Sequence, residues 1–375
     1  MVSKYTKDRR IIMNDNKIKQ SIETLSAGCS GLSWISEDQK HFWGRNFDFN
    51  RIASDSKITF VPSGTTFYAC GTAIEKNLDE STKLTSSYGV LGMGSLILKT
   101  TPTFFEGINE KGLMGGQLYY REFAKYADEV KEGTIPLQPI FAVTYFLSMC
   151  ATVEEVISKL ENDVTLIAKP VFGDIRYTHW MFSDRTGETI IIEPDVDKLK
   201  IHRHSMGVLT NSPNYDWHRT NLLNYCNIRS LDYSSVTLND DTIEACFSGS
   251  GAAGLPGDFS SPSRFTRLAF LKNYACKGKN EIEAVTYMFQ TFKNVQFPMG
   301  IVEVGEDKTI TEHDSGVVLF DYTIYTAVMC SESLRYYWVS YQNMRIQCVD
   351  MNPLIEKKQA VQFELNPIND IKYLN

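Results

Sequence analysis

The chain has 375 residues, of which 43% are hydrophobic and 22% charged, and its net charge is −7. These values are typical of a soluble globular protein with a substantial core, and no basic run suggests nucleic-acid binding. No apolar segment approaches the roughly 18 to 20 residues that span a bilayer, so we expect no membrane association.

The first 28 residues differ from the rest of the chain. Residues 1–28 are polar and lack a convincing periodicity, which predicts a removable or disordered leader. They include basic residues but no apolar stretch of about 7 to 15 residues, so they do not match a secretory signal. We therefore expect a cytoplasmic protein. Because no Pro/Gly/Ser-rich linker follows, we expect one domain over residues 29–375.

Strand-like runs dominate the next part of the chain. A hairpin is expected over residues 29–49, around the polar turn "SEDQK", and a second over 103–120, turning at 109–112. Further strand signals lie at 57–64 and 87–94.

Helical patterns follow in separate blocks. They cover residues 137–150 and 152–160, with Thr152 as N-cap, and later 263–275 and 281–295. Between these blocks, strands are expected at 178–194, as a hairpin turning at 184–187, and at 198–211; the segment 317–351 is again rich in strands. Grouped hairpins with helices in separate blocks predict an antiparallel α+β fold rather than a doubly wound parallel sheet.

Cys29 begins the first strand-like run, directly after the leader. A thiol at a chain's own N-terminus has a base beside it, because the reference pKa of an α-amino group is about 7.7 to 8.0, against about 8.5 for a thiol. Arg45 could favour the nucleophilic thiolate, and Asp48 could orient the α-ammonium. Arg45 and Asp48 would point to opposite faces of a regular strand, so their convergence requires a bend or bulge near Asn46 and Phe47. The residues alone leave open that Cys29 is one more buried structural thiol.

Six separated motifs occur in order along the chain: "CSGLSW…FWGRNFDF", "YGVLGMG", "EGINEKGL", "GVLTNSPNYDWHRTNL", "GLPGDFSSPSRFTRLAFL" and "YTAVMCSE". Together they resemble the landmarks of the choloylglycine hydrolase family, which comprises conjugated bile salt hydrolases and penicillin V acylases. The resemblance runs from Cys29 almost to the C-terminus. It implies an N-terminal-nucleophile hydrolase with a four-layer αββα sandwich that cleaves linear, non-peptide C–N amide bonds without metal or cofactor.

The resemblance also implies roles for individual residues. It makes Cys29 the nucleophile, with Arg45 and Asp48 beside it. Asn211, from the "TNSP" motif, would stabilise negative charge on the carbonyl oxygen, and such a donor is typically worth about 2.7 to 4 kcal/mol. Arg264, from the "SRF" motif, would fix the network around the thiolate or contact Cys29.

Tyr119 would supply the second oxyanion donor through its backbone N–H. At this position the bile salt hydrolases usually carry asparagine, in a Gly-Leu-Asn-Phe-like sequence, whereas penicillin V acylases tend to carry tyrosine. A phenol ring could stack on an aromatic acyl group. The resemblance therefore favours penicillin V as substrate, with conjugated bile salts as the alternative and another N-acyl amide, such as an acyl-homoserine lactone, as a third. A non-catalytic binding protein on the same fold stays open.

An N-terminal nucleophile requires that the bond between Gly28 and Cys29 be cut. Because Gly28 rather than an initiator methionine precedes the cysteine, we expect autoproteolysis by the Cys29 thiol; the small Gly28 leaves its carbonyl accessible.

Other features suggest no further chemistry. The Gly-rich segment 247–265 lacks the G-K-[ST] of a phosphate loop and more simply shapes the mouth of the site. His202 and His204 would share a strand face, but no third metal ligand lies nearby, and His179 is more simply a hydrogen-bonded core residue. The eight cysteines contain no C-x-x-C pair, so we assign neither a disulfide framework nor a metal. The segment 222–247 corresponds to an excursion that contributes to tetramer contacts in the family, which implies a homotetramer or, failing that, a dimer.

Overall fold

The computed structural model describes residues 28–71, 78–96, 98, 100–170, 175–195, 198–305, 310 and 314–374. Residues 1–27 of the expected leader therefore lie outside the described residues, and its removal or disorder stays a prediction.

The described residues form two large sheets, whose neighbouring strands are antiparallel. The seven-stranded sheet has the order β15-β1-β2-β20-β21-β22, with β18 beside β20. Its strands are β1 (Gly28–Ile35), β2 (His41–Phe49), β15 (Val208–Leu209), β18 (Val302–Glu303), β20 (Phe320–Cys330), β21 (Arg335–Ser340) and β22 (Gln347–Asp350).

The eight-stranded sheet has the order β14-β13-β12-β9-β8-β7-β4-β23. Its strands are β4 (Lys57–Val61), β7 (Val90–Ser95), β8 (Thr103–Asn109), β9 (Met114–Tyr119), β12 (Thr178–Ser183), β13 (Thr189–Pro194), β14 (Leu199–His202) and β23 (Val361–Phe363). Short pairs complete the strands: β3 (Ile52–Ala53) with β19 (Asp314–Ser315), β5 (Thr66–Tyr68) with β6 (Lys83–Thr85), β10 (Ile135–Leu137) with β11 (Val164–Leu166), and β16 (Val236–Leu238) with β17 (Asp241–Ile243).

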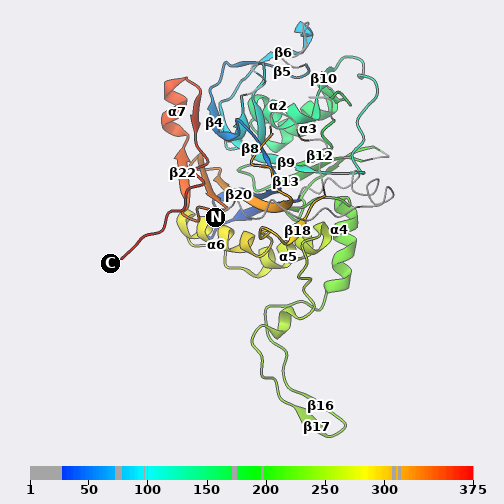
Figure 1. Ribbon diagram of the computed structural model, residues 1–375. Helices are drawn as coiled ribbons and strands as arrows, with labels where there is room; N and C mark the ends of the chain where they lie inside the picture. The colour runs from blue at the N-terminus through cyan, green and yellow to red at the C-terminus, as the bar shows by residue number, and fades with distance from the viewer. Residues whose placement is uncertain are drawn as a thin grey trace, which may run out of the picture.

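Helices cover the sheets on separate sides, as Figure 1 shows. Helix α2 (Ala142–Met149) packs on β7, β8 and β9 of the eight-stranded sheet, and α3 (Val153–Asn162) follows it in the chain. Helices α5 (Ser261–Tyr274) and α6 (Glu281–Lys293) pack on β1, β2 and β20 of the seven-stranded sheet. Strands β1 and β2 contact β9, so residues between the sheets are shielded on both sides.

The α+β class and the three predicted hairpins are confirmed: β1 pairs with β2, β8 with β9, and β12 with β13. The predicted cap is also present, because the Thr152 side chain accepts a hydrogen bond from the Glu155 N–H at 3.2 Å. A hydroxyl at this position satisfies one of the N–H groups that a helix start leaves without an intrahelical partner.

The expected strand over 198–211 is interrupted, so the predicted pairing of two histidines on one face is wrong. β14 ends at His202, and His204 has a φ of +47°, a left-handed conformation that breaks a strand. The sequence analysis also missed α4 (Tyr215–Asn221) and α7 (Asn352–Lys357). α4 starts at an Asn214 cap, which accepts from the Trp217 N–H at 3.0 Å.

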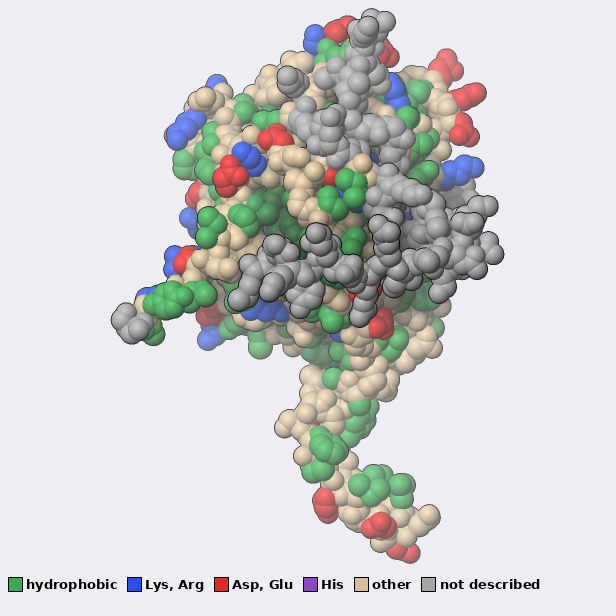
Figure 2. Space-filling model, in the orientation of Figure 1, with side chains coloured by type: hydrophobic (Ala, Val, Ile, Leu, Met, Phe, Trp, Pro, Cys, Tyr) green, Lys and Arg blue, Asp and Glu red, His purple; other side chains and the backbone are tan. Residues whose placement is uncertain are grey.

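Residues 222–258 form an arm that leaves the body of the molecule at the end of α4 (Figure 1). The arm carries β16 and β17 at its tip, with the one-turn helices η3 (Leu222–Tyr225) and η4 (Ser250–Ala252) nearer the body. Figure 2 shows apolar side chains along it, and Leu223, Leu231 and Phe247 are each more than 70% exposed.

Candidate active site

The candidate nucleophile lies between the two sheets. Cys29 is the second residue of β1 and is only 5% exposed. Arg45 on β2 pairs with Gly31, two residues from Cys29, so the Cys29 and Arg45 side chains lie on the same face of the sheet. The Arg45 Nη2 donates a hydrogen bond of 2.6 Å to the Cys29 Sγ. The structure thus brings the predicted cation directly onto the thiol.

Asp48 reaches this site through a break in strand regularity. The pairing of β2 with β20 shifts register between Phe47 and Asp48, one residue from the expected position. Asp48 lies opposite Gly28, and its Oδ1 accepts a hydrogen bond of 2.5 Å from the Thr323 hydroxyl. The Asp48 Oδ2 is buried and has no hydrogen-bond partner among the described residues. Burial raises the pKa of Asp48 to about 6, although the Arg264 guanidinium and the Thr323 hydroxyl oppose this rise.

Arg264 on α5 contacts the backbone of the candidate nucleophile. Its Nη1 donates to the Cys29 carbonyl oxygen at 2.5 Å and to the Ser30 hydroxyl at 2.8 Å, and its Nη2 donates to the Asn211 Oδ1 at 2.7 Å. The same Asn211 oxygen accepts from the Cys29 N–H at 2.9 Å. Arg264 and Asn211 therefore fix the peptide of Cys29 rather than its sulfur.

Tyr119 joins the site through its carbonyl oxygen, which accepts a hydrogen bond of 2.8 Å from the Asn211 Nδ2. A primary amide has two N–H donors, so this contact leaves the second hydrogen of Asn211 for a bound ligand. The expected contribution of the Tyr119 backbone N–H stays a prediction.

The pKa of the Cys29 thiol is raised, primarily by burial. Arg45 opposes this effect and favours the thiolate, whereas the negative charge of Asp48 adds to it. With Gly28 still attached, the thiol therefore needs a base before it can act as a nucleophile.

Sequence reasoning missed the carboxylate behind Arg45. Glu106 on β8 is fully buried, and its Oε2 accepts from the Arg45 Nη1 at 3.3 Å. The hydroxyls of Tyr325 and Tyr336 donate to Glu106 at 2.9 and 2.8 Å, and the Arg45 Nη1 also donates to the Gln117 carbonyl at 2.7 Å. Burial raises the pKa of Glu106, but all three neighbouring side chains donate to it and favour the ionised form.

A second buried carboxylate was also missed. Glu193 on β13 faces the His179 Nδ1 at 3.2 Å and the His202 Nε2 at 3.1 Å, and it accepts from the Tyr215 N–H at 3.0 Å. The other ring nitrogen of His179 lies 3.0 Å from the carbonyl oxygen of Thr210, the residue before Asn211. His179 is thus a hydrogen-bonded core residue, as predicted.

His218 holds the same segment from the other side. Its Nε2 lies 2.9 Å from the Asn211 carbonyl oxygen, and its ring stacks on Phe265 at a centroid distance of 4.5 Å. Burial lowers the pKa of His218 to about 4, so the ring is neutral at neutral pH and donates through Nε2.

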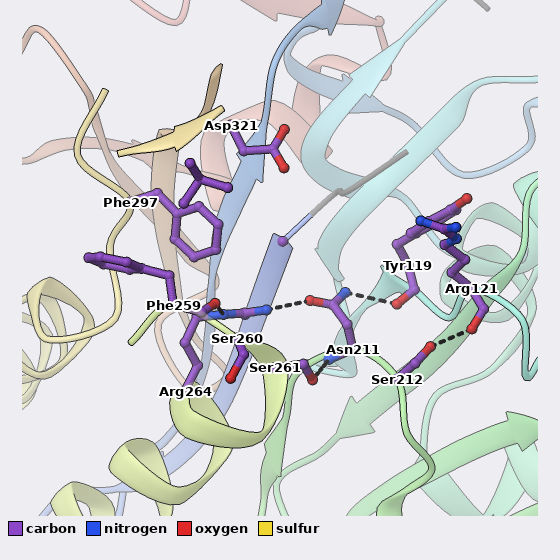
Figure 3. Close-up of a pocket in the computed structure, with 12 residues that line it drawn as sticks. Tyr119, Arg121, Asn211, Ser212, Phe259, Ser260, Ser261, Arg264, Phe297 and Asp321 are labelled. Carbon is purple, nitrogen blue, oxygen red and sulfur yellow. Dashed lines mark hydrogen bonds between the residues drawn. The ribbon is translucent and has the colours of Figure 1, made fainter. Parts of the chain in front are cut away.

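A pocket of about 350 Å³ opens beside this cluster (Figure 3). Its lining consists of Gly28, Tyr119, Arg121, Asn211, Ser212, Phe259, Ser260, Ser261, Arg264, Phe297, Val302 and Asp321. A Cβ atom on Gly28 would lie 2.7 Å from the Cζ of Phe297, so the space before Cys29 accepts only a glycine without rearrangement. The predicted role of the Gly-rich segment agrees with the lining, which includes Phe259 and Ser260.

No group of three or more His, Cys, Asp or Glu side chains placed to hold a metal ion occurs within the described ranges. In the same residues, no helix is both long and apolar enough to cross a membrane.

The sequence profile of the family described as "Linear amide C-N hydrolases, choloylglycine hydrolase family" matches residues 29–356. A bile salt hydrolase/transferase of Clostridium perfringens is 34% identical over 351 residues, covering 92% of this chain and all of the relative. A second bile salt hydrolase/transferase, from Lactiplantibacillus plantarum, is 28% identical over 86% of this chain and 92% of the relative.

The solved structures agree. The conjugated bile acid hydrolase of C. perfringens superposes with a TM-score of 0.79 at 32% identity, over 92% of this chain and 100% of that one. The penicillin V acylase of Agrobacterium tumefaciens, at 22% identity, superposes with a TM-score of 0.62 over 87% of each chain and so shares the fold.

Fold, profile and relatives together define a hydrolase of carbon–nitrogen bonds in linear amides. The chain belongs to the choloylglycine hydrolase family, as its six ordered motifs predicted.

Proposed function

We propose that this enzyme hydrolyses conjugated bile salts, releasing glycine or taurine from the steroid acyl group. The observation that carries the proposal is the 34% identity over the entire length of a bile salt hydrolase/transferase. The pocket supports it, because Phe259, Phe297 and Val302 give it an apolar wall beside the polar cluster at Cys29. This reverses the order that Tyr119 alone suggested.

In the proposed reaction the Cys29 sulfur attacks the amide carbonyl carbon. The negative charge that develops on the carbonyl oxygen is stabilised by the free N–H of Asn211, and the Tyr119 backbone N–H is the second donor. The amine half leaves with a proton, and a thioester to Cys29 remains. Water then hydrolyses the thioester, with the Cys29 α-amine relaying protons, and the thiol is regenerated.

The α-amine exists only after the Gly28–Cys29 bond is cut, and we propose that the chain cuts it itself. The Cys29 sulfur attacks the Gly28 carbonyl carbon, and the Cys29 nitrogen leaves as the α-amine. Water hydrolyses the resulting thioester and releases Gly28 as a carboxylate. The unpartnered Asp48 Oδ2 is placed to accept from the new α-ammonium, because Asp48 lies opposite Gly28 in the sheet.

Mass spectrometry of the purified protein tests this maturation. We expect the active enzyme to begin at Cys29, and an intact leader in a fully active sample would overturn the self-cleavage step. Gly28→Val should retain the leader, because its side chain collides with Phe297.

Penicillin V is the second candidate substrate, favoured by one residue. Tyr119 is one of the residues that line the pocket, and a phenol ring is a side chain that stacks on aromatic groups such as the phenoxyacetyl group of penicillin V.

A substrate panel separates the candidates. The wild-type enzyme is incubated with glycine and taurine conjugates of bile acids, with penicillin V and with an acyl-homoserine lactone, and the released amines are quantified. We expect the fastest release from the bile acid conjugates. Cys29→Ala should lose at least about 10⁴-fold in turnover. Equal turnover by Cys29→Ala and wild type would contradict the nucleophile, and no turnover of any substrate would favour a non-catalytic binding protein.

Three broader expectations belong to the same proposal. The two large sheets, with helices on separate sides of them, support the predicted αββα order of the N-terminal-nucleophile hydrolases. The arm, with its exposed Leu223, Leu231 and Phe247, supports a homotetramer, and size-exclusion chromatography with light scattering tests it. A cytoplasmic location stays a prediction from the leader.

A further inference from the structure

Helix α5 carries a second buried arginine, three residues after Arg264. Arg267 is 6% exposed, and the hydrogen bonds that it makes within the described residues all go to backbone carbonyl oxygens. Its Nη1 donates to Pro256 at 2.5 Å and to Asp258 at 2.7 Å, and its Nε donates to Asn294 at 3.0 Å. Arg267 therefore joins two segments that are far apart in the sequence.

Each of these two segments leads to an aromatic residue of the pocket. Phe259 follows Asp258, and Phe297 lies three residues after Asn294. Both phenylalanines line the pocket, and their rings form an edge-to-face pair with centroids 5.3 Å apart and planes at 63° (Figure 3). Because this pair forms the apolar wall, the spacing of the two segments sets the shape of that wall.

The two phenylalanines are anchored differently. Phe297 is fixed to β20, because its N–H donates to the Thr323 hydroxyl at 2.8 Å and its carbonyl oxygen accepts from the Thr323 N–H at 3.1 Å. Phe259 lies outside the strands, and its carbonyl oxygen accepts from the Arg264 Nε at 2.9 Å. The position of Phe259 therefore depends on side chains of α5, and Arg267 also holds the segment that leads to Phe297.

Stability alone does not explain a cation at position 267. Burial lowers the pKa of Arg267 although the negative charge of Asp258 opposes this, so keeping the charge here is unfavourable. The Arg267 Nη2 is also buried without a hydrogen-bond partner in the part of the chain that the structure describes. Replacing buried ionic groups by apolar side chains of similar volume is often neutral or stabilising. An apolar side chain, however, lacks the planar fork of donors that reaches both segments at once.

We propose that Arg267 is a positioning residue that fixes Phe259 against Phe297 and thereby determines which acyl groups fit beside Cys29. The inference rests on the proposed function, because it concerns the acyl half of that substrate. Arg267 acts through the wall and not on the reacting atoms, since its hydrogen bonds go to the two wall segments. Its loss should let Phe259 move away from Phe297.

Alkylation of Cys29 by two reagents tests this inference without any hydrolysis. Rate constants are measured for iodoacetamide and for an iodoacetamide that carries a naphthyl group on its nitrogen, and peptide mass spectrometry assigns the product to Cys29. Wild type should react about tenfold faster with the naphthyl reagent, as expected from one well-packed aromatic contact. Arg267→Met should reduce this ratio to about twofold, because the wall loses its shape.

Three further variants complete the test. Arg267→Lys keeps the charge but not the fork, so its ratio should lie between those of wild type and Arg267→Met, and it provides the measurement if Arg267→Met does not fold. Arg185→Met is the matched control, because Arg185 also donates to a backbone carbonyl, that of Ser331, and lies outside the pocket lining given above. In a Phe259→Ala background, Arg267→Met should change the ratio little further, because its effect passes through Phe259.

A purely structural role would change both alkylation rates by the same factor, together with a lower melting temperature. An unchanged ratio in folded Arg267→Met or Arg267→Lys, or a wild type without preference for the naphthyl reagent, overturns the role of Arg267 while the proposed function stands. A full effect of Arg267→Met in the Phe259→Ala background overturns it as well. If no bile salt is hydrolysed, the proposed function fails, and the alkylation ratio still decides whether Arg267 positions the wall.

Discussion

One buried glutamate, Glu106, contacts Arg45, and another, Glu193, contacts His179 beside the segment that carries Asn211; their surroundings differ. Glu106 is paired with the guanidinium of Arg45 and two phenols, and burial raises its pKa. Glu193 also loses hydration, but His179, His202 and a backbone N–H overcome that effect and lower its pKa from 4.5 to about 2.

The pKa of Glu106 is raised and that of Glu193 is lowered, which indicates different roles for the two carboxylates. A carboxyl group whose pKa is lowered by folding stabilises the protein at any pH above its unfolded-state pKa. This stabilisation is lost as the pH falls through the pKa of the folded state. Glu193 therefore stabilises the fold around Asn211 at neutral pH, and this contribution is lost as the pH falls from 4.5 to about 2. A raised pKa gives no such contribution, so Glu106 is retained at a cost in stability to hold Arg45 against the Cys29 sulfur. Four substitutions test this contrast.

Glu193→Gln should have the largest effect. We expect the free energy of unfolding at pH 7 to fall by about 3 kcal/mol, because the ionised form is favoured by more than two pKa units. Urea denaturation at pH 7 and pH 3 measures it, with the exposed Glu161→Gln as control. The difference in unfolding free energy between Glu193→Gln and wild type should be smaller at pH 3 than at pH 7. An equal loss at both pH values would show that the ionisation of Glu193 does not stabilise the fold.

Glu106→Gln should lower kcat about 100-fold with little change in KM, because Arg45 loses its charged anchor and a small misplacement is costly. Glu110→Gln, in the turn of the same hairpin, is the control. The melting temperature of Glu106→Gln is measured beside its kcat. If the fall in kcat is fully explained by unfolded protein, seen as a lower melting temperature, Glu106 does not position Arg45 for catalysis.

Asp48→Asn should make Cys29 more reactive while it weakens turnover. The Asp48 charge raises the thiol pKa, so its removal should speed alkylation of Cys29 by iodoacetamide about tenfold at pH 8. Below pH 6 the two proteins should converge, because Asp48 is then protonated in wild type. Peptide mass spectrometry isolates the Gly28–Cys29 peptide of uncut chains, and Asp38→Asn serves as control. Slower alkylation in Asp48→Asn would show that Asp48 acts by orientation instead.

His202→Gln should have the smallest effect. His202 is one of several donors to Glu193 and is partly exposed, so its loss should cost about 0.5 kcal/mol of unfolding free energy at pH 7. A loss as large as that of Glu193→Gln would mean that His202 alone sustains the buried carboxylate.

Local patterns carried most of what could be predicted. Alternating residues and turn signals gave the three hairpins, and the opposite directions of Arg45 and Asp48 in a regular strand required the register shift that β2 contains. The motifs led to Cys29, Asn211 and Arg264, which lie in contact.

The supporting carboxylates could not be found in the same way. Glu106 and Glu193 each stand alone in an apolar strand, which is a signal of a buried charge. Their partners, however, come from other elements: Arg45 lies 61 residues from Glu106, and Tyr336 lies 230 residues from it. Packing of one sheet on the other brings Glu106 to its partners, whereas pairing of β13 with β12 and β14 brings Glu193 to His179 and His202. No local periodicity encodes either arrangement. His204 was misassigned for a local reason, because its left-handed backbone leaves no trace in the polar pattern.

The tight fit of Gly28 against Phe297 has a consequence for the time course of activity. Gly28 lines the pocket, so in a chain that keeps the expected leader this residue occupies part of the space in which the proposed substrate would bind. With self-cleavage as proposed, each molecule's first turnover is on its own chain, and a freshly made sample should show a lag before product appears. Because that event is intramolecular, the length of the lag should not change when the protein is diluted.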